Sequence, residues 1–329
     1  MTSDLPPGRG AGAKPDPFDG RDRYYVPSPA TTAAPSMNLR DKTSMAIYNQ
    51  GDTNSCTANA AAAAFWFEEK VRGDPTWGSD GPSRAFIYWL ARGGWDKSKN
   101  YDFSPVEDDG SWLRMAMNGI AKCGACPETE CRFPDINTSS EIIKKAINDK
   151  PKTPAFNKAE KHTINSYYRL DADRPLEKDE QLSDTEKDKL GADLLQKLKL
   201  CLTEGFPVCF TLWFYMSNAQ AWNTTSTPYM LNDPWKAGKV KRHTFSHQSG
   251  HSVVAVGYDD SKGHVLVQNS WGGSEPGGWG NGLFWMPYSY VTDFYGTVDF
   301  WTIRLNKSVT PGAPHVRWEQ VNQAILGTA

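Results

Sequence analysis

The chain has 329 residues, of which 39% are hydrophobic and 22% charged, and its formal net charge is −2. This composition allows a full core and excludes a fibrous or wholly disordered protein, and the absence of a basic block gives no sign of a nucleic-acid or membrane-surface partner. No apolar run reaches about 18 residues, and the start lacks the apolar core of a secretory signal, so we expect a cytoplasmic or otherwise intracellular protein.

The first 40 residues differ in composition from the rest. Residues 1–40 are rich in Pro, Gly, Ala, Thr and Ser, with one denser island that contains Tyr24 and Tyr25. Such composition predicts a flexible N-terminal segment, and the two tyrosines could dock on a folded body.

A cysteine at the start of a helix is the most informative local feature. Cys56 follows Gln50 by six residues, and residues 57–72 contain six alanines and neither Gly nor Pro, which predicts a helix that Gly73 ends. A cysteine placed there lies near unpaired backbone N–H groups and the positive end of the helix dipole, and both favour the thiolate. The alternative is a small buried core residue, which is the commoner place for a free cysteine.

The folded part of the chain divides into segments of different pattern. Aromatic-rich pieces separated by Gly, Pro, Asp and Ser predict a helical lobe at about 41–135. Dense mixed charge with few aromatics predicts a solvated, partly mobile insertion at about 141–190. An amphipathic helix followed by β-branched and aromatic runs predicts a β-rich lobe at about 192–305, and residues 306–329 are polar and predict a tail.

The other cysteines and histidines give weak signs of metal binding. Cys123, Cys126 and Cys131 contain half of a structural zinc site but lack a fourth ligand nearby, so three buried or partly buried thiols fit better. His243, His247 and His251 are spaced by four, but the β-rich run after His251 argues against a helix that would align them. Six cysteines in a chain of this length are too few for a disulfide scaffold. We therefore expect reduced thiols and no metal or other cofactor.

Two strands in the β-rich lobe bring a histidine to an asparagine. His251 directly precedes SVVAVGYDD, and Asn269 follows HVLVQ, with the turn-forming group at 260–263 between them. A β-hairpin of this kind places the start of one strand beside the end of the next, so the two side chains should be neighbours. The Asn269 carbonyl could then fix the His251 ring, and Trp271 could cover their hydrogen bond.

These residues resemble the papain-like cysteine peptidases (C1 family), in a divergent microbial-type branch. The matching pattern is Gln50, Cys56 at the start of the central helix, His251 before a Val/Ala-rich strand, and Asn-Ser-Trp-Gly at 269–272, in the order of the family. The resemblance covers about 40–305. It implies an α+β, two-lobed papain-like fold, with a catalytic domain at 41–305 and a cleft between the helical and the β-rich lobe.

The sequence departs from the family beside the nucleophile. The plant and lysosomal members have a Cys-Gly-Ser-Cys-Trp motif with His and Asn roughly 130 to 150 residues later. Here Thr53 replaces the first cysteine, Ser55 and Thr57 flank Cys56, and His251 lies farther along the chain. The missing partner at Thr53 removes the disulfide of the family, and Thr57 in place of Trp changes the wall beside the thiol, so side-chain preferences do not transfer.

The resemblance implies a thiol protease that hydrolyses peptide bonds in peptide or protein substrates. Cys56 and His251 would form a thiolate–imidazolium pair oriented by Asn269, with the Gln50 amide and the Cys56 backbone N–H as the oxyanion hole. Two alternatives stay open: a related acyl-transfer enzyme, such as a transpeptidase, deamidase or amidase, and a non-catalytic binding protein of the same fold. The sequence leaves the oligomeric state undetermined. A further hypothesis is that the segment 1–40 lies across the cleft as an inhibitory strap.

Overall fold

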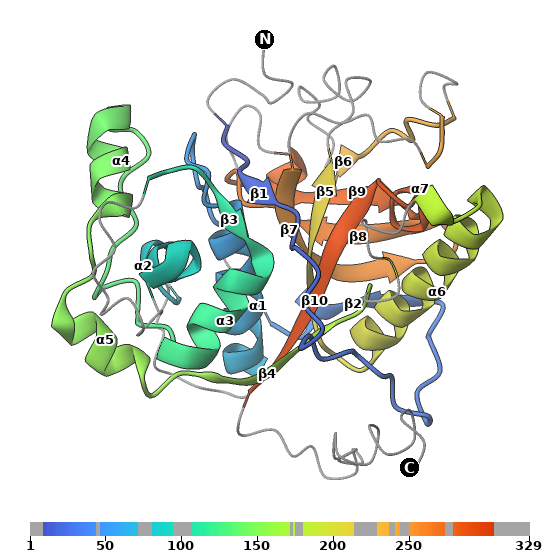
Figure 1. Ribbon diagram of the computed structural model, residues 1–329, viewed down its shortest axis with the longest axis horizontal. Helices are drawn as coiled ribbons and strands as arrows, with labels where there is room; N and C mark the ends of the chain where they lie inside the picture. Colours follow the sequence, from blue (N-terminus) through green and yellow to red (C-terminus); the bar gives the residue numbers. More distant parts are fainter. Residues whose placement is uncertain are drawn as a thin grey trace.

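The computed structural model shows a mixed helix-and-sheet protein in which helices and a large sheet lie side by side (Figure 1). None of the described helices is long and apolar enough to cross a membrane. The described residues are 9–43, 47–71, 81–94, 107–171, 174, 180–213, 229–236, 241–243, 250–273 and 279–305.

The helical lobe is built around one helix that is buried almost throughout its length. This helix, α1, runs from Cys56 to Val71, and its residues from Cys56 to Glu69 are all buried. A helix that is buried on every side forms the centre of a packed lobe, and its alanine run allows neighbours to approach closely. The surrounding elements are α2 (Arg84–Trp89), η2 (Leu90–Gly94), α3 (Leu113–Cys123), α4 (Ser140–Asn148) and α5 (Thr153–Ala159).

The sheet forms the second lobe and has the order β4-β10-β5-β7-β8-β9-β6. Its central strand β7 (Gly250–Asp259) pairs antiparallel with both β5 (Val208–Trp213) and β8 (His264–Gln268). The β7–β8 hairpin expected from the sequence is therefore confirmed. The other strands of this path are β4 (Ile164–Arg169), β10 (Thr297–Leu305), β9 (Leu283–Pro287) and β6 (Tyr229–Met230), and the short elements are η6 (Trp279–Gly282) and α7 (Tyr288–Thr292).

Both faces of the sheet are covered, which explains why its strands are apolar on both sides. Val254 and Val256 of β7 belong to the core cluster that contains α1, while Val253 and Ala255 belong to the cluster that contains α6 (Asp184–Thr203). This alternation is the period of two that a strand imposes on its side chains. α1 and β7 are thereby packed against each other, and this contact carries the functional residues.

One segment differs from its predicted structure, and a second lies outside the described residues. The segment expected to be a solvated insertion at about 141–190 contains α4, α5 and β4, and β4 pairs with β10 inside the sheet. The dense charge of this segment led to the wrong prediction, because α4 buries one apolar face and Tyr167 of β4 packs on Trp301. The tail expected at 306–329 lies outside the described residues.

The N-terminal segment, which we expected to be flexible, is built into the structure from Arg9 onward. Its β1 (Ala13–Lys14) pairs with β3 (Ser111–Trp112) on one side and with Gly250 of β7 on the other. Its β2 (Ser36–Asn38) pairs with the far end of β7 and leads into η1 (Leu39–Asp41). Figure 1 shows this segment, in blue, passing between the helices and the sheet. Hydrogen bonds from its backbone to β3 and β7 order this segment, although its small and polar side chains would not order it by themselves.

Candidate active site

Cys56 is the first residue of α1 and is fully buried. The turn before it is fixed by short polar side chains, since the hydroxyl groups of Thr53 and Ser55 lie 2.7 Å apart and Asn59 Nδ2 donates to Ser55 Oγ at 2.9 Å. Thr57 hydrogen-bonds the hydroxyl of Ser111 on β3. The residues that flank Cys56 therefore hold the start of the helix, and none of their hydroxyl groups points to a separate chemical role.

Gln50 connects the α1 side of the site to the chain that follows β8. Its backbone N–H donates to Ser270 O at 2.9 Å, and its Oε1 accepts from Ser270 Oγ at 2.7 Å. Its amide nitrogen donates to Thr53 O at 2.8 Å and to Gly10 O at 3.2 Å. The side chain is thus oriented with its N–H groups toward the start of α1 and its oxygen toward Ser270.

His251, Asn269 and Trp271 form a buried group on the sheet side. His251 Nε2 lies 2.7 Å from Asn269 Oδ1, and the same oxygen accepts from Ser270 N–H at 2.8 Å, which fixes the orientation of the amide. An amide oxygen only accepts, so Nε2 carries the proton and Nδ1 is the basic nitrogen of the neutral ring. The Trp271 ring stacks on His251 with centroids 4.3 Å apart and an interplanar angle of 24°. Trp271 therefore covers the ring and its hydrogen bond.

Burial shifts the pKa values of the Cys56 thiol and the His251 imidazole. It raises the pKa of the Cys56 thiol to about 12, although N–H groups of Ser252, Thr57 and Cys56 act in the opposite direction. It lowers the pKa of His251 to about 4, against the hydrogen bond with Asn269. Burial of both groups therefore favours the neutral thiol and the neutral imidazole over their charged forms.

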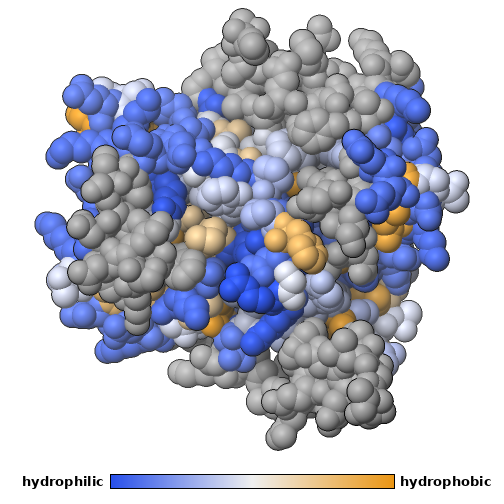
Figure 2. All heavy atoms as spheres, in the orientation of Figure 1, coloured by the Kyte–Doolittle hydropathy of each residue, from blue (hydrophilic) through white to orange (hydrophobic). Residues whose placement is uncertain are grey.

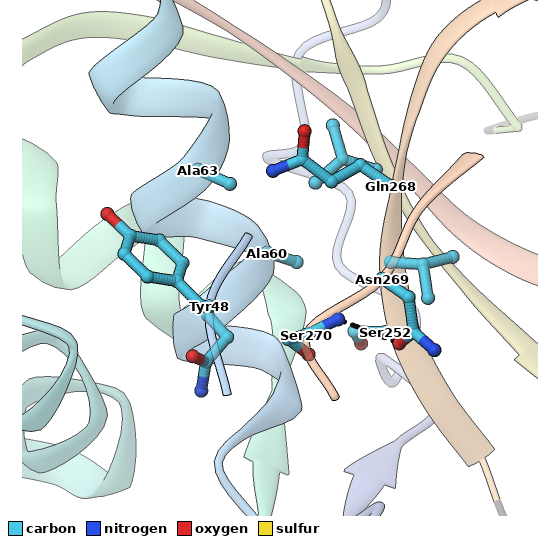
Figure 3. A pocket seen from close by; sticks show the side chains of 10 residues that line it. Tyr48, Ala60, Ala63, Ser252, Gln268, Asn269 and Ser270 are labelled. Atoms are coloured by element: carbon cyan, nitrogen blue, oxygen red, sulfur yellow. Dashed lines mark hydrogen bonds between the residues drawn. The ribbon is translucent and has the colours of Figure 1, made fainter. Parts of the chain in front are cut away.

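The N-terminal segment lies directly on these groups. Cys56 Sγ donates to Ala11 O at 2.9 Å, and both Gln50 Nε2 and Trp271 Nε1 donate to Gly10 O, the latter at 3.1 Å. A small cavity lies between α1 and β7, lined by Ala60, Ser252 and Asn269 among others (Figure 3). The space next to the thiol itself is filled by peptide backbone.

Sequence reasoning singled out Gln50, Cys56, His251, Asn269 and Trp271, and the structure brings all five to the contact between α1 and the β7–β8 hairpin. It missed Ser270, which ties Gln50 to the asparagine turn, and it missed Ser252, which touches the thiol. Ser270 was within the Asn-Ser-Trp-Gly run, so its position was visible although its contact was not. Ser252 gave no signal, because a serine inside a strand is usually a neutral packing residue.

The remaining candidates for metal binding are dispersed. All six cysteines are free, with Cys126 buried and Cys123 and Cys131 half-buried. His243 lies 3.0 Å from Asp188 through Nε2 and accepts from the Phe294 N–H through Nδ1, while His247 lies outside the described residues. Among the residues that the structure describes, no three His, Cys, Asp or Glu side chains are grouped to hold a metal.

Comparison with known proteins identifies the family of the chain. Residues 132–281 match the model of the Peptidase_C39 like family. An uncharacterized peptidase C1-like protein, L477, of Acanthamoeba polyphaga mimivirus is 31% identical over 260 residues, which cover 78% of this chain and 68% of that protein.

Solved structures show the same fold. Xylellain, a cysteine protease from Xylella fastidiosa, is 28% identical with a TM-score of 0.68, over 91% of this chain and 97% of that one. Digestive procathepsin L 3 of the Tenebrio molitor larval midgut is 15% identical with a TM-score of 0.57, over 91% of this chain and 76% of that one, and shows the fold alone. With the mimivirus relative, these findings show that the chain belongs to the papain-like, peptidase C1-like family of cysteine peptidases.

Proposed function

We propose that the protein is a cysteine endopeptidase in which Cys56 is the nucleophile, His251 the general base and acid, Asn269 the orienting residue and Gln50 an oxyanion-hole donor. One observation carries the proposal. The thiol of Cys56 and the side-chain amide of Gln50 both hydrogen-bond carbonyl oxygens of a single extended stretch of backbone, at Ala11 and Gly10. A site that already accommodates consecutive peptide carbonyls against a thiol and an amide donor suits a peptide substrate.

The proposed reaction uses these four residues in turn. His251 Nδ1 takes the proton of Cys56, and Sγ attacks the carbonyl carbon of the scissile bond. The Gln50 amide and the Cys56 backbone N–H hold the negative oxygen that develops, at the positive end of α1. His251 returns the proton to the leaving amine, which departs and leaves a thioester on Cys56. A water molecule then attacks the thioester with His251 as base, releasing the acid and the thiol.

Internal cleavage is supported by the way backbone runs through the site. Arg9 and Gly10 lie on the Asn49, Gly51 side of the thiol, and the chain continues past it to Ala13 and Lys14 between β3 and β7. Backbone therefore fits on both sides of Cys56, whereas an exopeptidase closes one side with a group that binds a chain terminus.

A peptide library analysed by mass spectrometry tests the proposal. The wild-type protein should release internal fragments with new N- and C-termini, and the Cys56→Ala variant should release none. Terminal ladders in place of internal fragments would show an exopeptidase, and cleavage that persists in Cys56→Ala would overturn the assignment of the nucleophile. The same digest with an added amine separates hydrolysis from transfer, since an amine adduct at the new C-terminus reports capture of the thioester.

A further inference from the structure

Arg84 is a charged residue of the helical lobe that contacts both segments carrying the proposed oxyanion-hole donors. It is the first residue of α2, and its side chain is only 13% exposed. Its Nη1 donates to the backbone carbonyl of Asn49 at 3.1 Å and to Oδ1 of Asn59 at 3.4 Å. Asn49 directly precedes Gln50, and Asn59 lies on the first turn of α1, three residues after Cys56. One guanidinium group therefore joins the two segments.

We propose that Arg84 is a positioning residue that holds the Gln50 amide and the Cys56 N–H at the separation that an oxyanion needs; this inference rests on the proposed function. The two donors are six residues apart and are separated by a turn. Groups that stabilise a transition state must keep their geometry to within about 0.5 Å, which requires support from side chains outside the turn itself. Arg84 gives such support to both ends of the turn.

On the Gln50 side, Arg84 fixes one peptide group. The C=O of Asn49 and the N–H of Gln50 belong to the same planar peptide unit. Arg84 donates to this carbonyl, and the N–H donates to Ser270 O at 2.9 Å. The Tyr48 ring also packs on the guanidinium, with 4.6 Å between the central carbon and the ring centroid. Because both ends of the peptide unit are held, the direction in which the Gln50 side chain leaves the backbone is fixed.

On the Cys56 side, Arg84 acts through Asn59. The Nδ2 group of Asn59 donates to Ser55 O at 3.0 Å and to Ser55 Oγ at 2.9 Å. Because the Oδ1 atom of Asn59 accepts from Arg84, its amide is oriented with the nitrogen toward Ser55. The C=O of Ser55 and the N–H of Cys56 again share one peptide unit. The same guanidinium therefore orients the second donor through a single intervening side chain.

Arg84 is itself held by a loop of the helical lobe. Its Nη2 lies 3.3 Å from Glu128 Oε1, and its backbone N–H donates to Glu128 Oε2 at 3.3 Å. The Phe133 N–H donates to the same Oε1 at 2.7 Å, and the Phe133 ring centroid lies 4.1 Å from the guanidinium carbon. A planar guanidinium can donate in several fixed directions while it packs on aromatic rings, which an ammonium group cannot do equally well. The position therefore favours arginine over lysine.

The test compares Arg84→Met with Arg92→Met in the full chain. Arg92 is a matched control, because its guanidinium also packs on a tyrosine, at 3.8 Å from the Tyr88 ring centroid, and also donates to an asparagine oxygen, Asn148 Oδ1. These contacts join η2 to α4. In Arg84→Met we expect kcat for a peptide to fall by about tenfold with KM within about twofold, because the two donors act mainly on the oxyanion of the transition state. Arg92→Met should keep the wild-type kcat.

Combination with Gln50→Ala separates positioning from a general loss of stability. Once Gln50 is alanine, Arg84→Met should lower kcat by no more than about threefold, because one of the two donors that it positions is already absent. A loss of folded protein would instead lower kcat by the same factor in both backgrounds. Arg84→Lys keeps a positive charge beside Glu128 without the planar fork, and should lower kcat by about threefold or more. It gives the same test if Arg84→Met does not fold by circular dichroism.

Three kinetic outcomes would overturn the role of Arg84: a kcat of Arg84→Met within about twofold of wild type, an equal fall in Arg92→Met, and the same fall with and without Gln50→Ala. Cleavage that Gln50→Ala slows and Arg84→Met does not would contradict Arg84 alone.

Hydrogen exchange of residues 49–56, followed by mass spectrometry, tests the same role without turnover. Faster exchange in Arg84→Met than in Arg92→Met, in a protein whose wild type cleaves no peptide, would support the positioning and contradict the proposed peptidase function. Equal exchange in the two variants would overturn the positioning.

Discussion

The two sides of the cleft are constructed in different ways. On the α1 side, Gln50 and Cys56 lie six residues apart, and a tight turn fixed by Thr53, Ser55 and Asn59 sets their positions. On the sheet side, His251 and Asn269 come from different strands and meet only through the register of β7 and β8. The first side therefore depends on local structure, whereas the second depends on correct pairing of the sheet. Figure 2 shows hydrophilic residues over much of the visible surface of both lobes.

The two sides also differ in how pH acts on them. The raised pKa of Cys56 contributes stability that is complete below about pH 9 and is lost as pH rises toward about 12. The lowered pKa of His251 contributes stability that is complete above its ordinary value of 6.5 and is lost as pH falls toward about 4. High pH therefore destabilises the folded protein through Cys56 on the α1 side, and low pH destabilises it through His251 on the sheet side.

Removing the thiol should give the largest effect. Cys56→Ala should lower kcat/KM by about a millionfold, as loss of the nucleophile does in a comparable triad. Cys123→Ala is the control, since this half-buried thiol lies at the end of α3 and should leave turnover near wild type. Peptide hydrolysis and mass mapping of alkylated cysteines measure both variants. Loss of turnover in Cys123→Ala together with retained turnover in Cys56→Ala would remove Cys56 from the catalytic role.

The next largest effect tests the link between the two sides. Gln50→Ala should lower kcat/KM by about a hundred- to a thousandfold, because one oxyanion donor is lost. Gln50→Glu keeps an oxygen that can accept from Ser270 Oγ but replaces the N–H donor, so it separates the chemical role from the structural one. We expect both variants to lose activity in peptide hydrolysis, because both lose the side-chain N–H donor, whereas only Gln50→Ala also loses the acceptor for Ser270 Oγ. Activity of Gln50→Glu within about threefold of wild type would exclude the donor role.

Much of the α1 side could be predicted from sequence, for a physical reason. The start of a helix is encoded by neighbouring residues, here the alanine run and the turn residues before Cys56. These signals do not depend on residues far away in sequence. The β7–β8 hairpin was also predictable because its turn at 260–263 and its β-branched strands are local. The placement of His251 beside Asn269 then follows from antiparallel geometry.

The errors concern segments whose order depends on distant partners. Residues 9–14 have no hydrophobic pattern of their own, and they are ordered by backbone pairing with Ser111 and Gly250, far away in sequence. β4 lies in a stretch of dense charge, yet it is held by β10 and by the buried Arg169, which lies between Asp171 and Asp299. A charge count cannot anticipate such pairing, because it treats each side chain as solvated.

On the sheet side, loss of the orienting amide should have a moderate effect. Asn269→Ala should lower kcat by about ten- to a hundredfold, part of the contribution that a positioned acid–base group makes. His251 Nε2 would lose its hydrogen bond to Asn269 Oδ1, and the ring could rotate beneath Trp271. Asn269→Asp keeps the acceptor and should recover part of the activity with an altered pH profile. Wild-type turnover in Asn269→Ala would show that packing against Trp271 is enough to orient the His251 ring.

The smallest expected effect is on stability, and it isolates the contribution of His251 on the sheet side. As pH falls from 6.5, the ordinary pKa of histidine, to about 5.5, His251 should lower the free energy of unfolding by about 1 kcal/mol. In this range the unfolded chain binds a proton at His251 and the buried ring does not. His251→Gln can still donate to Asn269 Oδ1 and should remove this slope in urea unfolding. Burial raises the pKa of Asp16 to about 6, which acts in the opposite direction over the same range, but Asp16 is present in both proteins. The difference between the two pH slopes therefore reports His251 alone, and identical slopes would mean that the ring is already accessible to water.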